Sequence, residues 1–435
     1  MNFLCNITVI SRELQSHEII DPILKNDLIY LDEHIVLDYS RFVHIIRNIQ
    51  KKLVDIKHNK IDSKIGSGSK NDTRSFGSIK NKIYIKLLSF VRNNINATID
   101  HLARKNYAKI AIKYVRKNSA YFDVVLSSFE PLSAHLIGGE IKKRHPDAFW
   151  IADFRDPAIV SSTPKKYINF YTSYIDRVAR TADVFTGVSD ICIKIFENKC
   201  NKKLYTICNG FDRDDLSDII PNKNNKLTFT YTGHLNREKQ DLAIIFKAIS
   251  ELINENKIHK DNIVINYAGN GEIEFRKQIE KYDLLESTKF HGFIDRRASL
   301  QLQMDSDILF LASWNTIGYT GVVTGKFLEY LMINKPILCA VVGNLANSQL
   351  KEMVTKANNG VVWEEANDKN DYPILKSYIL EQYEHFIKNE PLLFDPNMDY
   401  IEQFNYKNIA QQFIDLIEAN TRVWKYEGYK TNTTI

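Results

Sequence analysis

A lysine and a glutamate stand three residues apart in the stretch GVVTGKFLEYLMINKPIL, residues 321–338, which opens with glycines and then becomes apolar at helical spacing. Residues three apart share one face of a helix, so Lys326 and Glu329 can act on the same ligand. A carboxylate there can accept two hydrogen bonds from a ribose diol, and a lysine one turn earlier can face a diphosphate. The alternative is a surface ion pair, worth only about 0.3–0.5 kcal/mol. The apolar residues around both side chains argue against such an exposed pair. The pair therefore indicates a nucleoside diphosphate lying across the start of the helix.

Two earlier loops offer further phosphate-binding groups. Arg237 and Lys239 come shortly after Gly233 at the end of one predicted strand, and a turn follows the next strand, formed by Gly269, Asn270 and Gly271. Glycine lets a phosphate approach the backbone, a helix N-terminus supplies free N–H groups, and Arg and Lys add full charges. Each loop taken singly is more often a plain turn or a solvated helix start. Together with the loop before Lys326, they make three such loops at equivalent points of one repeating half, and this predicts a common anion site.

The elements that must position these residues are short apolar strands alternating with helices of about 10–15 residues. A turn-rich segment at 209–226 separates two sets of predicted strands. The first set lies at 122–128, 148–154 and 183–189, and the second at 227–233, 262–269 and 306–313. This alternation predicts an α/β fold with a parallel sheet in each half. Ligands of such sheets bind at the carboxyl ends of the strands, which is where the three loops lie.

The charge is unevenly distributed along the 435 residues, a length that predicts two domains. Residues 41–117 carry 19 Lys and Arg against four Asp and no Glu, whereas the whole chain has a net charge of +5. Such a segment indicates either a solvated surface or an anionic partner, such as an anionic membrane face. Nucleic acid is not expected, because the segment has no recognisable binding motif and few aromatic residues. Residues 57–82 within it are predicted to form a long mobile loop.

Cysteine usage and hydropathy bear on the compartment. The five cysteines include no CxxC pair, which is typical of free thiols in a reducing cytosol. The N-terminus lacks the basic region of a signal peptide, and no apolar run approaches the ~20 residues of a membrane span. A cytoplasmic protein is expected, soluble or peripheral on the inner face of the cell membrane.

Several stretches, taken in order, resemble the retaining glycosyltransferases of family four. In the second half they are YTGHLNREKQDLAIIFKAI, INYAGNGE, KFHGFIDR, SDILFLAS and the 321–338 stretch, and in the first half FDVVLSSFEPLSAHL, FWIADFRDP, ADVFTGVSD and ICNGFD. The resemblance implies the GT-B fold, in which two Rossmann-like domains with parallel sheets face each other across a cleft. It implies an acceptor-side domain over 1–212, a nucleotide-sugar-binding domain over 213–395, and terminal helices over 396–435 returning to the N-terminal domain.

The resemblance also assigns site residues. Glu329 corresponds to the family's ribose-binding carboxylate, but the carboxylate expected eight positions earlier falls on Gly321. A subset of the family with the pattern Gly-Val-x-Thr-Gly-Lys fits instead, so backbone N–H groups of 322–324 would hold the donor sugar. Lys239 matches the diphosphate-binding lysine, and Arg237 would substitute for an arginine replaced here by His234. The expected nucleotide-sugar site comprises Gly233, Gly269, Asn270, Gly271, Phe293, Gly321, Val322, Val323, Thr324, Lys326 and Glu329.

The expected catalytic residues are Asp156, Arg155, Arg237 and Lys239. Asp156 stands where relatives place a polar active-site residue on the acceptor side. A local ion pair among Asp153, Arg155 and Asp156 that caps the strand is an equal alternative. No Asp-x-Asp follows a strand to hold a metal, so metal-independent transfer without a cofactor is expected, with cations and helix dipoles stabilising the leaving diphosphate.

The N-terminus departs from the family pattern. Residues 6–15 resemble the family's second strand, and no glycine precedes Gly66. The first βα unit is therefore expected to be missing or divergent, which would leave an edge of the first sheet exposed.

The resemblance and the charge distribution together predict a retaining hexosyl- or N-acetylhexosaminyl-transferase, which moves a sugar from a nucleotide sugar to a lipid-linked or surface-glycan acceptor. The expected setting is lipopolysaccharide, O-antigen or capsule assembly. Residues 41–117 would rest on the anionic membrane face. Two alternatives stay open. One is a sugar-nucleotide 2-epimerase of GT-B fold, which needs no acceptor, and the other is a catalytically impaired or non-catalytic glycan-assembly subunit.

Overall fold

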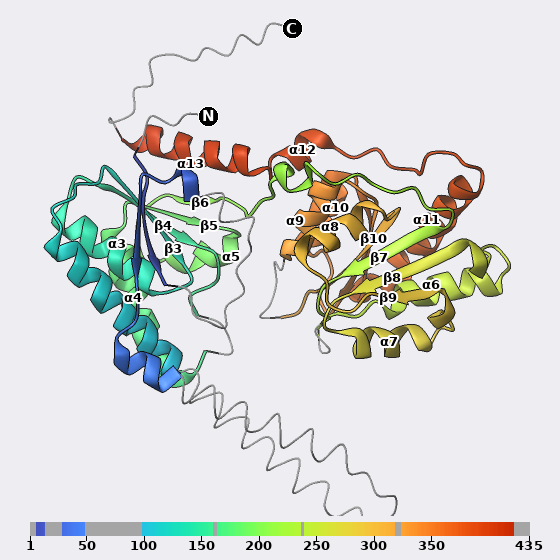
Figure 1. Ribbon diagram of the computed structural model, residues 1–435, viewed down its shortest axis with the longest axis horizontal. Coiled ribbons are helices and arrows are strands. Elements are labelled where there is room, and N and C mark those ends of the chain that lie inside the picture. The colour runs from blue at the N-terminus through green and yellow to red at the C-terminus, as the bar shows by residue number, and fades with distance from the viewer. Residues whose placement is uncertain are drawn as a thin grey trace, which may run out of the picture. The chain divides into compact units, whose positions relative to one another are not determined.

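The computed structural model describes residues 6–13, 28–47, 98–159, 163–235, 239–317 and 323–421. It divides into two compact units: unit 1 runs up to Thr206 and resumes at Asn420, and unit 2 is Ile207–Ala419. Both units have parallel strands with helices between them (Figure 1). The α/β class predicted from the alternation is thereby confirmed. The loop predicted at 57–82 lies outside the described residues.

Unit 2 contains a six-stranded parallel sheet in the order β12-β11-β10-β7-β8-β9. The strands are β7 (Leu227–Thr232), β8 (Ile263–Ala268), β9 (Thr288–Phe290), β10 (Ile308–Trp314), β11 (Ile337–Val342) and β12 (Gly360–Glu364). The first strand, β7, lies in the middle, with β8 and β9 on one side and β10 to β12 on the other. This is the doubly wound order, in which the direction of the connections reverses between β7 and β10.

The helices of unit 2 are α6 (Ala243–Asn254), α7 (Glu272–Glu280), α8 (Arg296–Met304), α9 (Gly325–Ile333), α10 (Gln349–Ala357), α11 (Asp368–Ile387), α12 (Met398–Glu402) and α13 (Tyr406–Asn420). Helices α6 to α11 cover the two faces of this sheet, and α12 and α13 follow them in the chain. Successive side chains of a strand point to opposite faces, so the buried run of β10 serves two cores. Phe310 packs with Phe246 of α6, whereas Leu309 packs with Phe327 of α9.

Unit 1 contains two separate sheets. One has four parallel strands in the order β3-β4-β5-β6, namely Val124–Phe129, Phe149–Phe154, Val184–Gly187 and Leu204–Thr206. The other pairs β1 (Thr8–Arg12) with β2 (Glu33–Leu37), also in parallel. Helices α3 (Ser133–Arg144), α4 (Lys165–Thr181) and the short α5 (Asp190–Ile193) accompany them, and residues 98–117 are also helical. None of the helices in the described ranges is both long and apolar enough to span a bilayer.

The segments by which the chain enters and leaves the body of unit 2 are joined by backbone hydrogen bonds. The N–H of Phe211 donates to the carbonyl of Phe404, and the N–H of Tyr406 donates to the carbonyl of Phe211, both at 2.9 Å. Gly210 permits this approach, because a Cβ atom there would lie 2.3 Å from the carbonyl oxygen of Phe404. The two segments therefore run side by side.

Candidate functional site

The carboxyl ends of β7 and β10 form the switch point of the unit 2 sheet. These two strands are neighbours, with Phe229 opposite Ile308 and Thr230 opposite Leu309. The chain leaves β7 at Gly233 toward α6 and β8, and leaves β10 at Asn315 toward α9 and β11. Connections that diverge in this way leave the strand ends accessible, and doubly wound sheets bind their ligands there.

Lys326 and Glu329 lie together in the first turns of α9, next to the end of β7. The Nζ atom of Lys326 lies 2.7 Å from Oε1 of Glu329 and 3.1 Å from Oγ1 of Thr232. Gln303 of α8 donates from Nε2 to the same two oxygens, at 2.9 Å to Thr232 and 2.7 Å to Glu329. The lysine side chain is 25% exposed and that of the glutamate 16%. Both side chains are thus half-buried and tied to the switch point.

The second oxygen of the Glu329 carboxylate is held more loosely. Its Oε2 atom lies 3.7 Å from Nη1 of Arg296, which is beyond hydrogen-bond length, while Nη2 of Arg296 donates to Asp215. A carboxylate oxygen in such a place can accept hydrogen bonds from the hydroxyl groups of a ligand.

The N-terminus of α9 is open on one side. Thr324 is the N-cap residue, but its side chain makes no capping hydrogen bond, and its buried Oγ1 has no partner among the described residues. A Cβ atom placed on Gly325 would meet nothing within 4 Å. The N–H groups of Gly325 and Lys326 precede the first hydrogen bond of the helix, which Phe327 donates to the Thr324 carbonyl at 3.0 Å. Together with the helix dipole they make such a helix start suitable for an anion.

Two glycine loops pack against each other at the ends of β7 and β8. A Cβ atom on Gly269, whose φ is +150°, would lie 2.1 Å from the carbonyl oxygen of Gly233. The Tyr267 hydroxyl donates to that same carbonyl at 3.0 Å and accepts from the N–H of Gly271 at 2.7 Å. Burial raises the pKa of the Tyr267 phenol, so the hydroxyl stays protonated. Asn270 is exposed at the tip of its loop.

Lys239 is placed at the carboxyl end of β10, because its Nζ lies 5.1 Å from the centre of the Trp314 ring. Phe293 is 69% exposed and follows β9 at the edge of the sheet. Its loop joins the glycine loops through a hydrogen bond from the N–H of Gly269 to the carbonyl of Gly292. Val323 is partly buried beside the core that includes Phe327. Three expected site residues, Arg237, Gly321 and Val322, lie outside the described residues.

In unit 1, Asp153 is a structural residue. Its carboxylate is 1% exposed and accepts from Ser128 Oγ at 3.0 Å, Thr186 Oγ1 at 2.7 Å and Arg155 Nε at 2.6 Å. It therefore ties β3, β4 and β5 together and holds Arg155, which corresponds to the strand-capping ion pair foreseen as an alternative.

Asp156, in contrast, lines a pocket of about 490 Å³ at the carboxyl ends of β3 and β4. Burial, and then the nearby Glu130 carboxylate, raise the pKa of Asp156. Glu130 is itself paired with Arg104, and the pocket is completed by aromatic side chains, including His101, Phe129, Tyr167 and Tyr171. Acidic groups beside aromatic rings can bind a polyol by hydrogen bonding and by stacking on its apolar faces.

Sequence reasoning missed Thr232, Tyr267 and Gln303. Thr232 and Tyr267 read as ordinary residues of buried strands, and Gln303 as a polar position on a helix. A weak signal was present in the sequence. Thr232 comes directly before Gly233, and Tyr267 comes two residues before Gly269.

A doubly wound unit with a lysine–carboxylate pair at the helix start beside its switch point, preceded by a second parallel α/β unit, has the architecture of the GT-B fold. Residues 212–388 match the family described as Glycosyl transferases group 1. This domain therefore belongs to that family, which confirms the resemblance to family four, and the chain is a nucleotide-sugar glycosyltransferase. No curated protein matches the sequence.

Two solved structures support the fold. The N-terminal domain of trehalose-6-phosphate phosphatase from Candida albicans aligns with a TM-score of 0.56 and 12% identity, over 96% of this chain and 97% of that chain. A UDP-forming alpha,alpha-trehalose-phosphate synthase from Burkholderia xenovorans aligns with a TM-score of 0.51 and 10% identity, over 74% of this chain and 79% of that chain. At such low identity the likeness establishes the fold and not the substrates.

Proposed function

We propose that unit 2 binds the donor sugar nucleotide, with its ribose on Glu329 and its diphosphate over the first turn of α9, and that unit 1 binds the acceptor. The observation that carries this proposal is the half-buried Lys326–Glu329 pair beside Thr232 at the end of β7. An ion pair on the protein surface would not be expected to have these additional hydrogen bonds to neighbouring elements. Here one carboxylate oxygen is fixed by Lys326 and Gln303, and the other is left to meet a diol.

In the proposed reaction an acceptor oxygen bonds to the anomeric carbon while the bond from that carbon to the diphosphate oxygen breaks. The electron pair of the broken bond stays on the diphosphate, and the acceptor's proton leaves with the departing phosphate. Attack occurs on the face from which the diphosphate departs, so the anomeric configuration is retained. Lys326, Lys239 and the N–H groups at the start of α9 stabilise the charge that develops on the leaving group. Backbone N–H groups around Val323 and Thr324 orient the sugar.

We assign the acceptor to the Asp156 pocket of unit 1, with a lipid-linked or surface-glycan intermediate as its substrate. Asp156 would hydrogen-bond the attacking hydroxyl, and Arg155, held by Asp153, would lie next to it in the chain. Asp156 would orient that hydroxyl, while the hydroxyl proton passes to the departing phosphate. Lipopolysaccharide, O-antigen or capsule assembly is the proposed setting.

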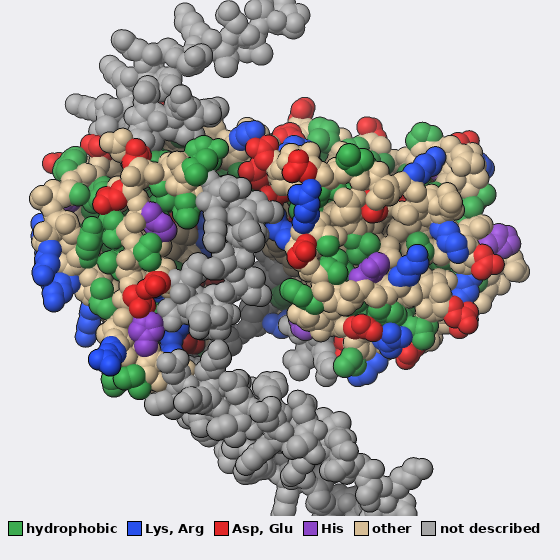
Figure 2. Space-filling model, in the orientation of Figure 1, with side chains coloured by type: hydrophobic (Ala, Val, Ile, Leu, Met, Phe, Trp, Pro, Cys, Tyr) green, Lys and Arg blue, Asp and Glu red, His purple; other side chains and the backbone are tan. Residues whose placement is uncertain are grey.

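The helix at 98–117 supports a membrane-facing role for the basic segment. Lys105, Lys109, Lys113 and Lys117 recur every fourth residue and so form one stripe along it, and the last three are exposed. Basic side chains lie along the edge of unit 1 where this helix runs (Figure 2). Each lysine near an anionic leaflet contributes about 1 kcal/mol to binding, so such a stripe is enough for peripheral attachment.

The donor proposal is tested by calorimetric binding of UDP, GDP and ADP and of their 2′-deoxy counterparts. We expect one ribonucleotide to bind at least about tenfold more tightly than its 2′-deoxy form, which corresponds to one hydrogen bond to a charged group. Glu329→Gln should remove this difference. Glu352→Gln, in the exposed pair with Lys356 on α10, is the matched control and should keep it. Absence of nucleotide binding, or a difference that survives Glu329→Gln, contradicts the proposal.

The class of reaction is tested by product release from the sugar nucleotide that binds. A transferase releases nucleoside diphosphate faster when a glycan or lipid-linked acceptor is added. Epimerisation of the sugar without any acceptor would instead support the 2-epimerase.

Membrane attachment is tested by sedimentation with vesicles of phosphatidylglycerol and of phosphatidylcholine. Replacing Lys109, Lys113 and Lys117 by Gln should reduce binding to the anionic vesicles at least about tenfold at low salt. The control replaces three exposed lysines of unit 2, Lys369, Lys388 and Lys407, so that the net charge is the same. Equal losses in both triple variants would rule out a role for the stripe.

A further inference from the structure

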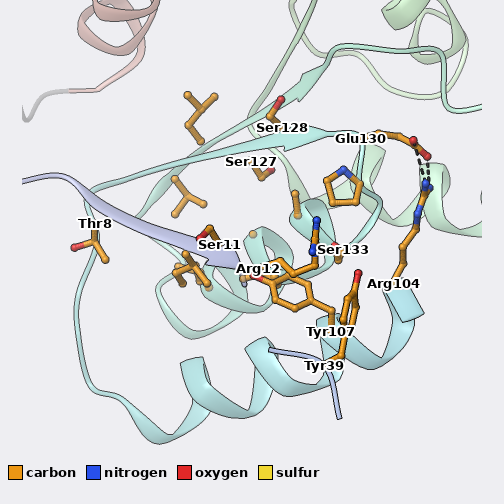
Figure 3. Close-up of a pocket in the computed structure, with 18 of the residues that line it drawn as sticks. Thr8, Ser11, Arg12, Tyr39, Arg104, Tyr107, Ser127, Ser128, Glu130 and Ser133 are labelled. Atoms are coloured by element: carbon orange, nitrogen blue, oxygen red, sulfur yellow. Dashed lines mark hydrogen bonds and ion pairs between the residues drawn. The ribbon is translucent and has the colours of Figure 1, made fainter. Parts of the chain in front are cut away.

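Within the described part of the chain, the Glu329 carboxylate accepts hydrogen bonds at one of its two oxygens. Nζ of Lys326 and Nε2 of Gln303 each lie 2.7 Å from its Oε1 atom. In unit 1, by comparison, Arg104 donates to both oxygens of Glu130, as the dashed lines in Figure 3 show. A bidentate pair of that kind fixes the whole carboxylate. The one-sided hold on Glu329 fixes the side chain and still leaves Oε2 for a ligand.

Gln303 reaches this carboxylate from a neighbouring helix. It belongs to α8, which lies beside α9 (Figure 1), and it is 0% exposed. A side chain that is completely enclosed does not contact the donor itself. Any effect of Gln303 on the donor must therefore pass through the groups to which it is bonded.

The orientation of the Gln303 amide favours Glu329. Its Nε2 atom donates to Glu329 and also to Thr232 at 2.9 Å and Ser299 at 3.1 Å. The opposite orientation would bring the amide oxygen against Oε1 of Glu329, and two acceptors repel each other. In the observed orientation the buried Oε1 atom of Gln303 has no partner among the described residues, which is unfavourable. An unsatisfied group of this kind beside a binding residue is typical of a functional position.

Lys326 and Gln303 hold the same two oxygens in different ways. Each donates to Oε1 of Glu329 and to Oγ1 of Thr232. Lys326 is charged and 25% exposed, so a diphosphate at the start of α9 attracts it and competes for its hydrogen bonds. Gln303 is uncharged and enclosed, so its bond to Glu329 stays intact when a diphosphate is present.

We propose that Gln303 is a positioning residue, which holds Oε1 of Glu329 while the donor is bound and so leaves Oε2 to select the ribose. This inference rests on the donor site of the proposed function. It predicts that Gln303 contributes to the preference for ribose over deoxyribose and little to the affinity for the diphosphate.

The test measures this ribose preference, which is the ratio between the affinities of a nucleoside diphosphate and of its 2′-deoxy form, by calorimetric titration with UDP, GDP and ADP. Gln303→Met has a side chain of similar size without a hydrogen-bond donor, and Gln303→Glu keeps the shape but offers acceptors only when ionised. We expect the preference to fall from at least about tenfold in the wild type to less than about threefold in both variants.

The absolute affinities supply a second readout. In Gln303→Met the affinity for the 2′-deoxy form should change less than about threefold, because the diphosphate contacts remain. In Gln303→Glu only the preference is compared, since the added negative charge repels every diphosphate.

Two controls separate positioning from a structural role. Ser299→Ala removes another acceptor of the Gln303 amide and should keep the ribose preference. Gln382 of α11 is also 0% exposed, and its amide makes hydrogen bonds of 2.8 and 3.1 Å with the backbone of Leu393. Gln382→Met should lower the urea midpoint of unfolding and keep the ribose preference.

The outcomes distinguish this inference from the donor assignment. The double variant Gln303→Met with Glu329→Gln should have the same ribose preference as Glu329→Gln alone, because both changes act on one contact. A preference that survives in Gln303→Met but is lost in Glu329→Gln overturns the inference and leaves the donor assignment standing. An equal loss of affinity for both nucleotide forms in Gln303→Met would show a structural role and also overturns it. A preference that survives in Glu329→Gln contradicts the donor assignment, and this inference with it.

Discussion

The Nζ atom of Lys326 lies 2.7 Å from Oε1 of Glu329, and both groups also contact the end of β7 through Thr232 and Gln303. Because the lysine both carries charge and orients the carboxylate, the proposed function predicts that removing it weakens two contacts of the donor at once. Its role is therefore distinguishable from that of a lysine in a surface pair.

For Lys326→Met we expect nucleoside diphosphate affinity to fall about 10- to 100-fold, because a charge-assisted contact to the diphosphate and the alignment of Glu329 are both lost. Thermal stability should change little, since the lysine is partly exposed and Gln303 still bonds the carboxylate. Calorimetric titration and thermal unfolding measure the two effects. Lys356→Met, in the exposed pair on α10, is the control, and an equal loss of affinity there would refute the assignment.

Two glycines of the site should respond in opposite directions to alanine. Gly269→Ala forces a Cβ atom against the Gly233 carbonyl at a φ of +150°, so we expect a loss of more than about 2 kcal/mol of unfolding free energy. Gly325→Ala meets open space within a helix and should gain about 0.5–1 kcal/mol. Its methyl group would nevertheless obstruct an anion at the helix start, so nucleotide affinity should drop at least about tenfold. Unfolding and titration on both variants check this, and unchanged affinity in Gly325→Ala would place the diphosphate elsewhere.

The Tyr267 hydroxyl should contribute more to the free energy of unfolding than the hydroxyl of an exposed tyrosine. Tyr267→Phe leaves the Gly233 carbonyl and the Gly271 N–H without their shared partner, so we expect a loss of about 1–3 kcal/mol from unit 2. Urea unfolding measures it, with Tyr406→Phe as a control because that side chain is 49% exposed. Equal effects of the two substitutions would contradict the bridging role.

Unit 1 should lose stability in mild acid because of His135. Its ring is buried among Phe129, Phe154 and Tyr174, and burial lowers the pKa of His135 to about 3. The unfolded chain protonates this histidine near pH 6.5, so between the two values the unfolded state binds more protons, and stability falls as the pH falls. Between pH 7 and pH 5 the loss should be on the order of 2 kcal/mol.

This pH dependence can be measured by urea unfolding at both pH values, followed by pulse deuterium labelling of β3 and β4. His135→Phe should remove most of the difference between pH 7 and pH 5, whereas replacing the exposed His34 by Phe should keep it. A difference between pH 7 and pH 5 that is the same in the wild type and in His135→Phe would contradict this role of His135.

Local patterns predicted the elements well, because each apolar run carries its own signal. The strand predicted at 227–233 is Leu227–Thr232, and the one at 148–154 is Phe149–Phe154. The i,i+3 spacing likewise predicted that Lys326 and Glu329 share a face. Contacts set by strand order were not predictable in this way. Gln303 reaches Glu329 only because α8 and α9 are neighbours, and Ser128 and Thr186 reach Asp153 from 25 and 33 residues away.

The N-terminal unit illustrates the same limit. The sequence predicted a strand within residues 6–15, but not that it would pair with Glu33–Leu37 in a sheet separate from that of β3 to β6. That arrangement depends on long-range packing of β1 and β3 against the helix at 98–117, whose apolar positions do not reveal their partners. The ion pair between Asp153 and Arg155 is likewise seen only in the hydrogen bonds of the folded chain, and a catalytic role for Asp156 and Arg155 stays a prediction.

The hydrogen-bonded pair of segments at Phe211 and Phe404–Tyr406 has a consequence for how this protein can be rebuilt. The chain enters the body of unit 2 at Phe211 and leaves it at Phe404–Tyr406. Because these two segments lie side by side, the residues between them can be exchanged between proteins at one place in the structure. On the proposed function, chimaeras that exchange residues 211–406 between related chains should keep donor choice with the exchanged residues and acceptor choice with the rest of the chain.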